Sequence, residues 1–340
     1  MKEKVKVAII GFGTVGKRIA DAVRAQDDMQ VAGIVKKSPS AELYPAIQKG
    51  YGIYAINDES RADFNKAGFE VSGDLSSLLE KSDIAIVATP DDTAEEYIKI
   101  CKQYGLPVII QGGEDHELSG ISFNSEANYY DAWEKEVVRV VSCNTTALVR
   151  ALYPLNRKFG IEKVRATLIR RAADPNDSKK GPINALVPEV EIPSHHGPDV
   201  NTILPELDIT TVAAKASTTL MHLHALNIKL EKSCTEEDII DLYESRPRIR
   251  LVSSKQKIKS TADIMELARD MGRPRGDMWE NSIWKDSIRF NKGELYFFEA
   301  VHQESIVVPE NVDAIRSMLG LEPGELASIA KTNKAMGIER

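Results

Sequence analysis

Cys143 is the residue of this sequence whose neighbours best suit a chemical role. It lies in the polar run Ser142-Cys-Asn-Thr-Thr146, after the apolar stretch 137–141 and before apolar residues with helical spacing. Ser142 can cap that helix, so we expect the thiol in the first helical turn. Free amide N–H groups and the helix dipole there lower a thiol pKa and favour a nucleophilic thiolate. The alternative is a small buried hydrophobic residue, which is our interpretation of Cys101.

Four of the six histidines occur in two pairs. His195 and His196 lie in Pro193-Ser-His-His-Gly-Pro-Asp199, which proline and glycine should keep irregular, and such a loop suits contact with an anion or a substrate. His222 and His224 alternate on a predicted strand and share one face. A general base is the favoured role for this pair, ahead of a metal site, because no cysteine or acid completes a ligand set. A hydrogen-bonded core histidine is the alternative.

The segment Gly11-Phe-Gly-Thr-Val-Gly16 is a G-x-G-x-x-G motif between a predicted strand and a predicted helix. In this context Gly11 permits a tight turn, Gly13 a close approach of pyrophosphate, and Gly16 close packing of helix on strand. The helix N-terminus offers amide donors to phosphate groups. The sequence therefore predicts a dinucleotide site.

The residues after the second predicted strand bear on the choice of dinucleotide. An acid at this point is typical of NAD sites, because it binds the ribose 2′-hydroxyl. This chain instead has Lys36, Lys37 and Ser38, and shows no carboxylate among them. We therefore expect NADP to be preferred and NAD to be a weaker cofactor. The alternative is that both lysines only solvate a loop.

A dinucleotide site, a cysteine at a helix start and downstream histidines together predict an aldehyde dehydrogenase. The thiolate would add to the aldehyde, and hydride transfer would leave a thioester. Arg170 and Arg171 could hold a phosphate group in a bidentate manner, or form ion pairs. We expect Arg246, Arg248 and Arg250 to alternate on a strand edge at a surface or subunit interface.

Strands and helices must position these residues, and their order along the chain predicts an α/β protein. Up to residue 140, short apolar strands alternate with helices, as in a doubly wound parallel Rossmann sheet. In the second part of the chain the strands are longer and more alternating, which predicts an α+β catalytic domain with a mixed or antiparallel sheet. We expect residues 1–140 to form the dinucleotide-binding domain, with C-terminal helices in 305–340 packing back on it. Residues 141–304 should form the catalytic domain. Predicted strands are 5–10, 31–35, 83–88, 107–110, 137–141, 164–170, 209–218, 226–230, 249–253, 287–290 and 294–301, and predicted helices are 15–24, 93–104, one from near 235, and 260–271.

Composition excludes several classes of protein. The 340 residues carry a net charge of −7, which argues against a dedicated nucleic-acid binder. No apolar run approaches the ~20 residues of a membrane span, and the N-terminal apolar run is too short for a signal peptide. Three scattered cysteines suit neither a disulfide framework nor a zinc cluster, so we expect a soluble cytoplasmic protein without a metal.

The chain resembles the archaeal (type II) phosphorylating glyceraldehyde-3-phosphate dehydrogenases along essentially its full length. The resemblance rests on a set of motifs that occur in the same order. They are Gly11-Phe-Gly-Thr-Val-Gly-Lys-Arg18, Gln111-Gly-Gly-Glu114, Ser142-Cys-Asn-Thr-Thr146, Arg170-Arg-Ala-Ala-Asp-Pro175, Lys180-Gly-Pro-Ile-Asn184, Pro193-Ser-His-His-Gly-Pro-Asp199, Thr218-Thr-Leu-Met-His222, Ala300-Val-His-Gln-Glu-Ser305 and Lys331-Thr-Asn-Lys-Ala-Met336.

This resemblance implies a homotetramer that reversibly converts glyceraldehyde 3-phosphate and inorganic phosphate into 1,3-bisphosphoglycerate with NADP or NAD, in glycolysis or gluconeogenesis. It implies that Cys143 is the nucleophile and His222 the catalytic base. The cofactor-contacting positions that it implies are Thr14, Val15, Gly113, Arg171, Gln303 and Asn333, beside the loop glycines. The substrate-contacting positions are Ser142, Asn144, His195 and His196.

The sequence departs from many relatives just after the nucleophile. Where they continue with Gly-Leu-Cys-Arg, this chain has Ala147-Leu-Val-Arg150, so a second cysteine near the nucleophile is absent. The mechanism does not need that cysteine. The rival functions are an NADP-dependent semialdehyde dehydrogenase of amino-acid biosynthesis and a non-enzymatic redox sensor that binds a dinucleotide.

Overall fold

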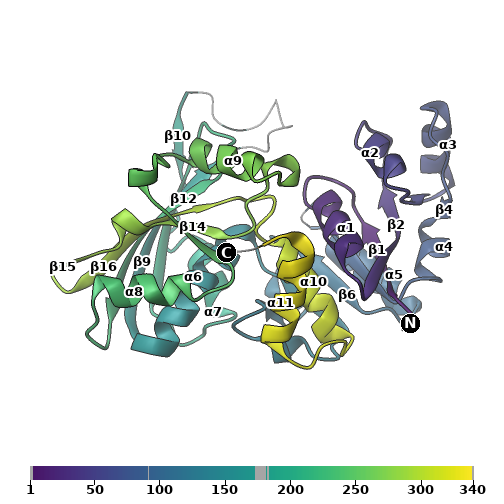
Figure 1. The fold of residues 1–340 in the computed structure, drawn as a ribbon. Coiled ribbons are helices and arrows are strands. Elements are labelled where there is room, and N and C mark those ends of the chain that lie inside the picture. Colours follow the sequence, from purple (N-terminus) through teal and green to yellow (C-terminus); the bar gives the residue numbers. More distant parts are fainter. Residues whose placement is uncertain (1–2, 91, 173–180, 182–183, 339–340) are drawn as a thin grey trace. The chain divides into compact units, whose positions relative to one another are not determined.

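The structure is a computed structural model that describes residues 3–90, 92–172, 181 and 184–338. The chain divides into two compact units (Figure 1). The first unit comprises residues 1–142 and 308–339, and the second comprises residues 143–307. Parts of two motifs, residues 173–175 and 180, 182 and 183, lie outside the described residues.

A parallel sheet of eight strands forms the first unit, in the order β4-β3-β2-β1-β5-β6-β8-β7. The chain order reverses between β1 and β5, which is the point where doubly wound sheets bind nucleotides at the carboxyl ends of their strands. The strands are β1 (Val5–Ile10), β2 (Met29–Lys36), β3 (Ile53–Ala55), β4 (Gly73–Asp74), β5 (Ile84–Val87), β6 (Val108–Gln111), β7 (Ser122–Phe123) and β8 (Val137–Val140).

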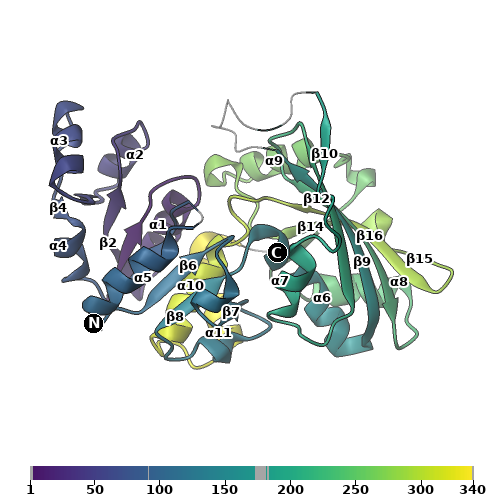
Figure 2. The same ribbon diagram turned by 180° about the vertical axis from the view of Figure 1, so that it is seen from behind.

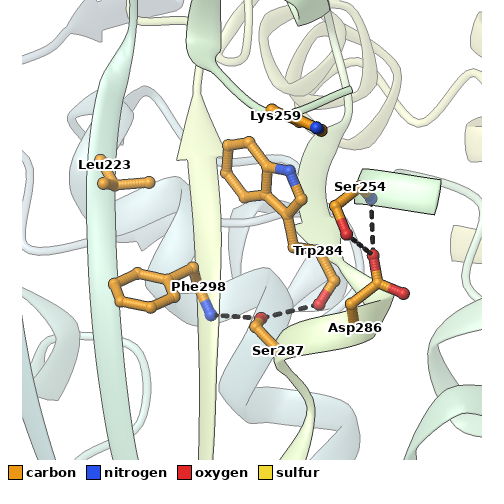
Figure 3. A pocket seen from close by; sticks show the side chains of 7 residues that line it. All are labelled: Leu223, Ser254, Lys259, Trp284, Asp286, Ser287 and Phe298. Atoms are coloured by element: carbon orange, nitrogen blue, oxygen red, sulfur yellow. Dashed lines mark hydrogen bonds between the residues drawn. The ribbon is translucent and has the colours of Figure 1, made fainter. Parts of the chain in front are cut away.

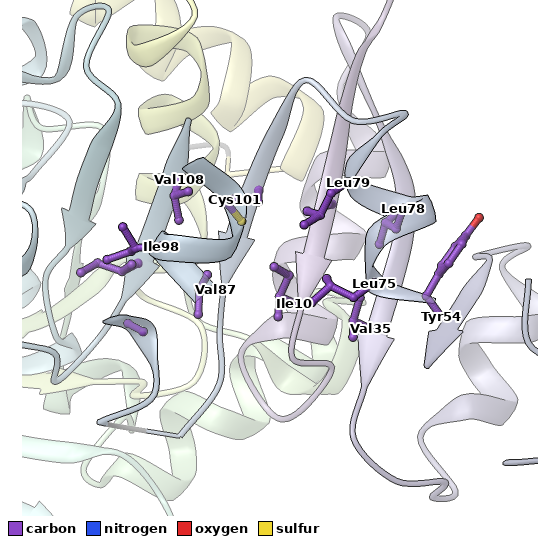
Figure 4. Packing of buried hydrophobic residues seen from close by; sticks show 14 residues of the cluster. Ile10, Val35, Tyr54, Leu75, Leu78, Leu79, Val87, Ile98, Cys101 and Val108 are labelled. Carbon is purple, nitrogen blue, oxygen red and sulfur yellow. The ribbon is translucent and has the colours of Figure 1, made fainter. Parts of the chain in front are cut away.

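Helices lie on both faces of this sheet, as the two opposite views show (Figures 1 and 2). On one face, Leu78 of α4 and Ile98 of α5 pack on Ile10 and Val87 in a continuous apolar core (Figure 4). Burial on both faces explains why these strands are continuous apolar runs. The helices of this unit are α1 (Gly16–Ala25), α2 (Leu43–Gln48), α3 (Asp58–Lys66), α4 (Leu75–Leu79), α5 (Ala94–Gln103), α10 (Val308–Met318) and α11 (Glu325–Met336).

The two C-terminal helices, α10 and α11, belong to the first unit and pack on α1. Arg316 of α10 is fully buried, and its guanidinium donates to Asp28 (2.7 Å), Gln26 (2.8 Å) and Thr332 (2.5 Å). A buried charge requires such complete pairing. Arg316 therefore joins the end of the chain to the connection between α1 and β2.

The second unit contains a mixed sheet in the order β10-β11-β9-β12-β16-β14-β13, with β15 paired to β16. Its strands are β9 (Ile161–Arg171), β10 (Leu186–Pro188), β11 (Ile209–Ala216), β12 (His222–Leu230), β13 (Ile249–Val252), β14 (Asn281–Trp284), β15 (Arg289–Asn291) and β16 (Glu294–Val301). Helix α6 (Cys143–Phe159) contacts β12, β14 and β16. The other helices are α7 (His196–Asn201), α8 (Glu236–Glu244) and α9 (Thr261–Asp270).

Strand alternation decides which residues of β12 face the core. His222, His224, Leu226 and Ile228 are buried, whereas the residues between them are partly exposed. On the neighbouring strands the outward face carries exposed apolar side chains, namely Ile169 (38%), Tyr296 (38%) and Phe298 (45%). One face of this sheet is therefore covered by its own unit, and the other is covered by α9 at Ala300 and carries exposed apolar side chains elsewhere.

A cavity of about 350 Å³ lies on that outward face (Figure 3). Leu223, Trp284 and Phe298 form its apolar walls, and Lys259 and Asp286 lie at its polar side. It is lined from β12, β14 and β16, on the side opposite His222 and His224.

Among the helices of the described residues, none combines the length and the apolar character that a membrane span requires.

The predicted α/β fold is confirmed, with a parallel sheet in the first unit and a mixed sheet in the second. A tight turn joins β15 to β16, where Lys292 and Gly293 have positive φ. Capping boxes at Thr235 and Ser260 begin α8 and α9. The shortest elements, such as β3, β4 and β7, were not predicted because two or three residues carry too little periodicity.

Three local predictions were wrong. The segment after His195 is helical rather than irregular, because Pro198 falls in the first turn of α7, where no intrahelical N–H is required. Arg246 and Arg248 precede β13, and Arg248 is buried, so the three arginines do not alternate on a strand edge. The strand predicted over 287–290 begins only at Arg289, after a 3-10 turn.

Candidate active site and dinucleotide site

Two glycines of the motif that follows β1 are required by close packing. Gly11 has φ +93°, and a β-carbon there would lie 2.5 Å from the Ala88 carbonyl oxygen after β5. A β-carbon at Gly16 would lie 2.0 Å from the carbonyl oxygen of Gly11. Both distances are far below van der Waals contact, so any side chain would push the loop off the sheet or the helix off the loop.

Gly13 differs from its two neighbours because a β-carbon there would meet nothing within 4 Å. The space beside it is open, as the close approach of a pyrophosphate requires. Thr14 and Val15 complete the turn, and Val15 at the N-cap of α1 provides no side-chain acceptor for the first amides. The ten-residue helix α1 thus presents donors and a positive dipole end to an anion. These residues fit a bound dinucleotide.

The expectation that no carboxylate accompanies Lys36 was wrong. Glu42 lies 2.7 Å from the Lys36 ammonium and 3.1 Å from that of Lys17. Burial opposes ionisation of Glu42, but the hydrogen bonds and charges of these two lysines outweigh it and lower its pKa. Lys36 therefore faces an internal anion, whereas Lys37 is exposed. The sequence distance of six residues between Lys36 and Glu42 hid this pair.

Two further predicted cofactor positions belong to the first unit. Gly113 is exposed and follows β6 at the carboxyl edge of the sheet, next to Gly112, which has φ +90°. This is the edge that also carries the glycine loop after β1. Asn333 is buried on α11.

Cys143 and His222 meet in the second unit, where α6 begins against β12. The Sγ atom of Cys143 lies 3.6 Å from Nε2 of His222. Cys143 is the first residue of α6 as predicted, and Ser142 immediately precedes it. The cap by Ser142 remains a prediction. Two residues 79 positions apart thus form a thiol–imidazole pair.

The prediction that the Cys143 thiol has a lowered pKa was wrong. Burial raises the pKa of the thiol to about 11, although the charges of Arg170 and Arg171 and the Asn144 backbone N–H act in the opposite direction. Burial, with the charges around it, also lowers the pKa of His222 well below its usual value. At neutral pH the pair is therefore an uncharged thiol and an uncharged imidazole, because desolvation outweighs the helix dipole.

Arg171 supports His222 with its backbone and is itself held by one amide and one acid. Its N–H donates to Nδ1 of His222 at 2.9 Å. Its guanidinium contacts the Gln303 carboxamide and lies 2.9 Å from Glu304. Burial opposes ionisation of Glu304, but the hydrogen bond from His302 and the charge of Arg171 outweigh it and hold its pKa at about 2. Arg171 and Gln303, both predicted cofactor positions, are thus brought together.

Asn144 and His196, both predicted substrate positions, lie in a buried polar network. The Asn144 carboxamide lies 3.2 Å from Nε2 of His196 and 2.9 Å from Nε2 of His224. Nδ1 of His224 lies 2.9 Å from the Glu299 carboxylate. Burial, followed by nearby positive groups, lowers the pKa of His196 to about 2, so this ring is neutral. His196 and His224 have no exposed surface.

His195 is the exposed member of its pair, with 63% of its side chain accessible. Its ring centroid lies 3.8 Å from that of His196. Glu189, His195 and His196 place potential ligand atoms within 4.8 Å of one another. Arg170 pairs with Glu189, however, and both ring nitrogens of His196 are hydrogen-bonded, which disfavours a metal there. Arg170 thus forms an ion pair, the alternative to its binding phosphate.

Sequence reasoning missed Glu299, Glu304 and Glu42. One signal was available for Glu299, because strand parity places it with Leu295 and Phe297 on the inward face of the predicted strand 294–301. An acid at an apolar-parity position indicates a buried partner. Glu304 and Glu42 lie outside such a pattern, and only the folded chain identifies their partners.

The doubly wound sheet with its glycine loop, and the cysteine–histidine pair of the second unit, define a two-domain dehydrogenase that uses a nicotinamide dinucleotide. Two family models match the chain. The model for "Dihydrodipicolinate reductase, N-terminus" matches residues 5–122, and that for "Glyceraldehyde 3-phosphate dehydrogenase, C-terminal domain" matches residues 142–273. The full-length comparisons give the particular family.

The chain belongs to the glyceraldehyde-3-phosphate dehydrogenase family, in its archaeal form. It is 54% identical to the glyceraldehyde-3-phosphate dehydrogenase of Methanosarcina mazei, over 98% of this chain and 99% of that one. It is 53% identical to the protein of that name from Methanococcoides burtonii, with the same coverage. The protein of that name from Methanothermus fervidus is 49% identical over 98% of each chain.

Proposed function

We propose that this protein catalyses the reversible, phosphorylating oxidation of D-glyceraldehyde 3-phosphate to 1,3-bisphosphoglycerate, as a step of glycolysis or gluconeogenesis. The observation that carries this proposal is the Cys143–His222 pair at 3.6 Å, in a chain about half identical to named dehydrogenases of this substrate. In the proposal the first unit binds the dinucleotide, and the second unit carries out the chemistry.

The covalent steps take place on Cys143. Its thiolate adds to the aldehyde carbon to give a thiohemiacetal, whose oxidation gives a thioester. When bound, the nicotinamide dinucleotide supplies the hydride acceptor for that oxidation. Inorganic phosphate then attacks the thioester carbonyl, so that a C–O bond forms, the C–S bond breaks and the thiolate is regenerated.

His222 acts beside the sulfur atom. Because its Nδ1 accepts the Arg171 N–H, a neutral ring carries its proton on Nε2, facing Cys143. From this position it can donate to the thiolate and to the oxygen anion of the thiohemiacetal. To form the thiolate, the thiol proton passes to Nε2 of His222, which is the general-base role expected from the sequence. For that step the ring must carry its own proton on Nδ1 and give up the bond from the Arg171 N–H. Ser142, Asn144, His195 and His196 are proposed to bind the substrate.

The proposed cofactors are NADP, which we expect to be preferred, and NAD. Lys36 and Lys37 support a 2′-phosphate, whereas Glu42 opposes it by pairing with Lys36. Gly11, Gly13, Gly16, Thr14, Val15, Gly113, Arg171, Gln303 and Asn333 are proposed as further contacts. The three free thiols support a reducing cytoplasmic location. A homotetramer is supported by the exposed apolar face of the second unit.

The test follows NADPH absorbance from glyceraldehyde 3-phosphate with and without inorganic phosphate, and then with NAD. We expect reduction only with phosphate. Cys143→Ala should lower turnover by about 10⁴-fold or more and leave cofactor binding unchanged. Reduction that does not require phosphate contradicts the phosphorylating reaction. No reduction, together with activity on aspartate semialdehyde, indicates a semialdehyde dehydrogenase, and dinucleotide binding without either activity indicates a sensor.

A further inference from the structure

His224 is a buried histidine for which the reaction above has no use. It follows His222 on the same face of β12 and has no exposed surface. Its Nδ1 lies 2.9 Å from the Glu299 carboxylate, and its Nε2 lies 2.9 Å from Oδ1 of Asn144. Glu299 is equally buried, and its second oxygen accepts from the Asn281 carboxamide at 2.9 Å. Asn281 also donates to the Ala147 carbonyl oxygen of α6.

The partners of His224 determine the direction of its hydrogen bonds. Each ring nitrogen faces an oxygen, and a carboxylate or an amide oxygen can only accept. The ring of His224 therefore donates from Nδ1 to the Glu299 carboxylate and from Nε2 to the Asn144 oxygen. Asn281 satisfies the second oxygen of Glu299, so each polar atom of the buried His224 and Glu299 side chains has a partner.

The same order of donors continues beyond Asn144. Its Nδ2 donates to Nε2 of His196 at 3.2 Å, and the neutral His196 ring then carries its proton on Nδ1, which faces the Ser194 hydroxyl at 3.1 Å. The Ser194 hydroxyl lies 2.8 Å from that of Thr211, which donates to the Ser194 carbonyl oxygen at 3.0 Å. From His224 onward each member of this chain donates to the next, and on its other side His224 donates to the Glu299 carboxylate.

We propose that His224 and Glu299 are positioning residues, which fix the carboxamide of Asn144 beside Cys143 so that its second N–H can donate to a substrate oxygen. This inference rests on the proposed function. Without the His224 donor, the Asn144 amide can turn over, because its oxygen and nitrogen are similar in size and the His196 end alone does not distinguish them. Asn144 follows Cys143 directly in α6, so its orientation is set where the substrate reacts.

Two substitutions of His224 separate the two ring nitrogens. Glutamine places its amide N–H where Nε2 lies, so His224→Gln can still donate to Asn144. Asparagine places its amide N–H where Nδ1 lies, so His224→Asn reaches Glu299 but not Asn144. We expect His224→Asn to lower kcat/KM for glyceraldehyde 3-phosphate by about 10- to 100-fold, and His224→Gln to restore most of that loss.

A double-mutant cycle with Asn144→Ala tests whether His224 acts through Asn144. If it does, adding His224→Asn to Asn144→Ala should change kcat/KM by no more than about two-fold. Cofactor affinity, far-UV circular dichroism and the alkylation rate of Cys143 should stay at wild-type values in each folded variant. Thr235→Ala, which removes the N-cap of α8 in the same unit, is the control for a loss of stability alone.

Wild-type turnover is measured first, so that a failure of the proposed function is recognised before any variant is compared. Wild-type kcat/KM in His224→Asn, or an effect that persists in the Asn144→Ala background, overturns the positioning role. If His224→Asn does not fold, the cycle is run with Glu299→Ala, which removes the partner of Nδ1, and with Glu299→Gln, whose amide can donate to Nδ1 and leave Nε2–H facing Asn144. A loss in Glu299→Ala that is absent in Glu299→Gln and in the Asn144→Ala background supports the proposal. No loss in Glu299→Ala, or a loss that persists without Asn144, overturns it.

Discussion

The backbone N–H of Arg171 donates a 2.9 Å hydrogen bond to Nδ1 of His222. A neutral imidazole has one N–H, so this bond directs the ring proton to Nε2, which lies 3.6 Å from the sulfur of Cys143. An imidazolium would point a second N–H at the Arg171 N–H, which is repulsive. The geometry therefore favours a neutral donor beside the sulfur over a thiolate–imidazolium ion pair.

The first prediction concerns the pH dependence of Cys143 alkylation in the free protein. Because burial raises the thiol pKa to about 11 and lowers that of His222 far below its usual value, only the thiol titrates above pH 6. The thiolate fraction, and with it the rate of reaction with iodoacetamide, should rise about ten-fold per pH unit from pH 7 to 10. Peptide mass spectrometry separates Cys143 from Cys101 and Cys234. A plateau that begins near pH 6 to 7 would indicate the ion pair instead.

The second prediction concerns Glu42, which competes with a 2′-phosphate for the positive charge of Lys36. Lys36→Ala should raise KM for NADP by about ten-fold or more and leave KM for NAD nearly unchanged, because only NADP carries that phosphate. Glu42→Gln frees Lys36 and removes a negative charge, so it should lower KM for NADP. The ratio of kcat/KM for the two cofactors is the measurement. Equal changes for both cofactors would exclude this site for the phosphate.

The third prediction uses two glycines of one loop as a matched pair. Gly16→Ala places a β-carbon 2.0 Å from the Gly11 carbonyl oxygen, so it should destabilise the protein by about 3 kcal/mol. Gly13→Ala meets only open space, so the Tm should stay near the wild-type value while cofactor binding weakens. Thermal unfolding and cofactor titration are compared for both variants. Undiminished cofactor binding by Gly13→Ala would place the pyrophosphate elsewhere.

The fourth prediction concerns the stability that Glu304 contributes as an ion. Its pKa of about 2 in the folded protein is below the usual value of 4.5. The difference corresponds to about 3 kcal/mol, which is fully present above pH 4.5 and is lost as the pH falls towards 2. Glu304→Gln should therefore destabilise the protein at pH 7, and its difference from wild type should shrink below pH 4.5. Urea unfolding at several pH values measures this, and a pH-independent difference would refute it.

The local parts of this structure followed from the sequence alone. The strand, glycine loop and helix over 5–25, the start of α6 at Cys143, and the shared inward face of His222 and His224 are all as predicted. Such features depend on periodicity and on caps within a few residues, so a short window of sequence contains the information. The resemblance to the family rests on the same short motifs.

Only the tertiary structure decided the partners and the protonation of the site. His222 receives the Arg171 N–H from 51 residues away, and His224 meets Glu299 from 75 residues away. Neither distance is contained in a local pattern. The Cys143 thiol pKa shows the physical reason most clearly. The helix start lowers it, as the sequence predicts, but desolvation by everything packed around the sulfur raises it further, and the sum depends on the whole fold.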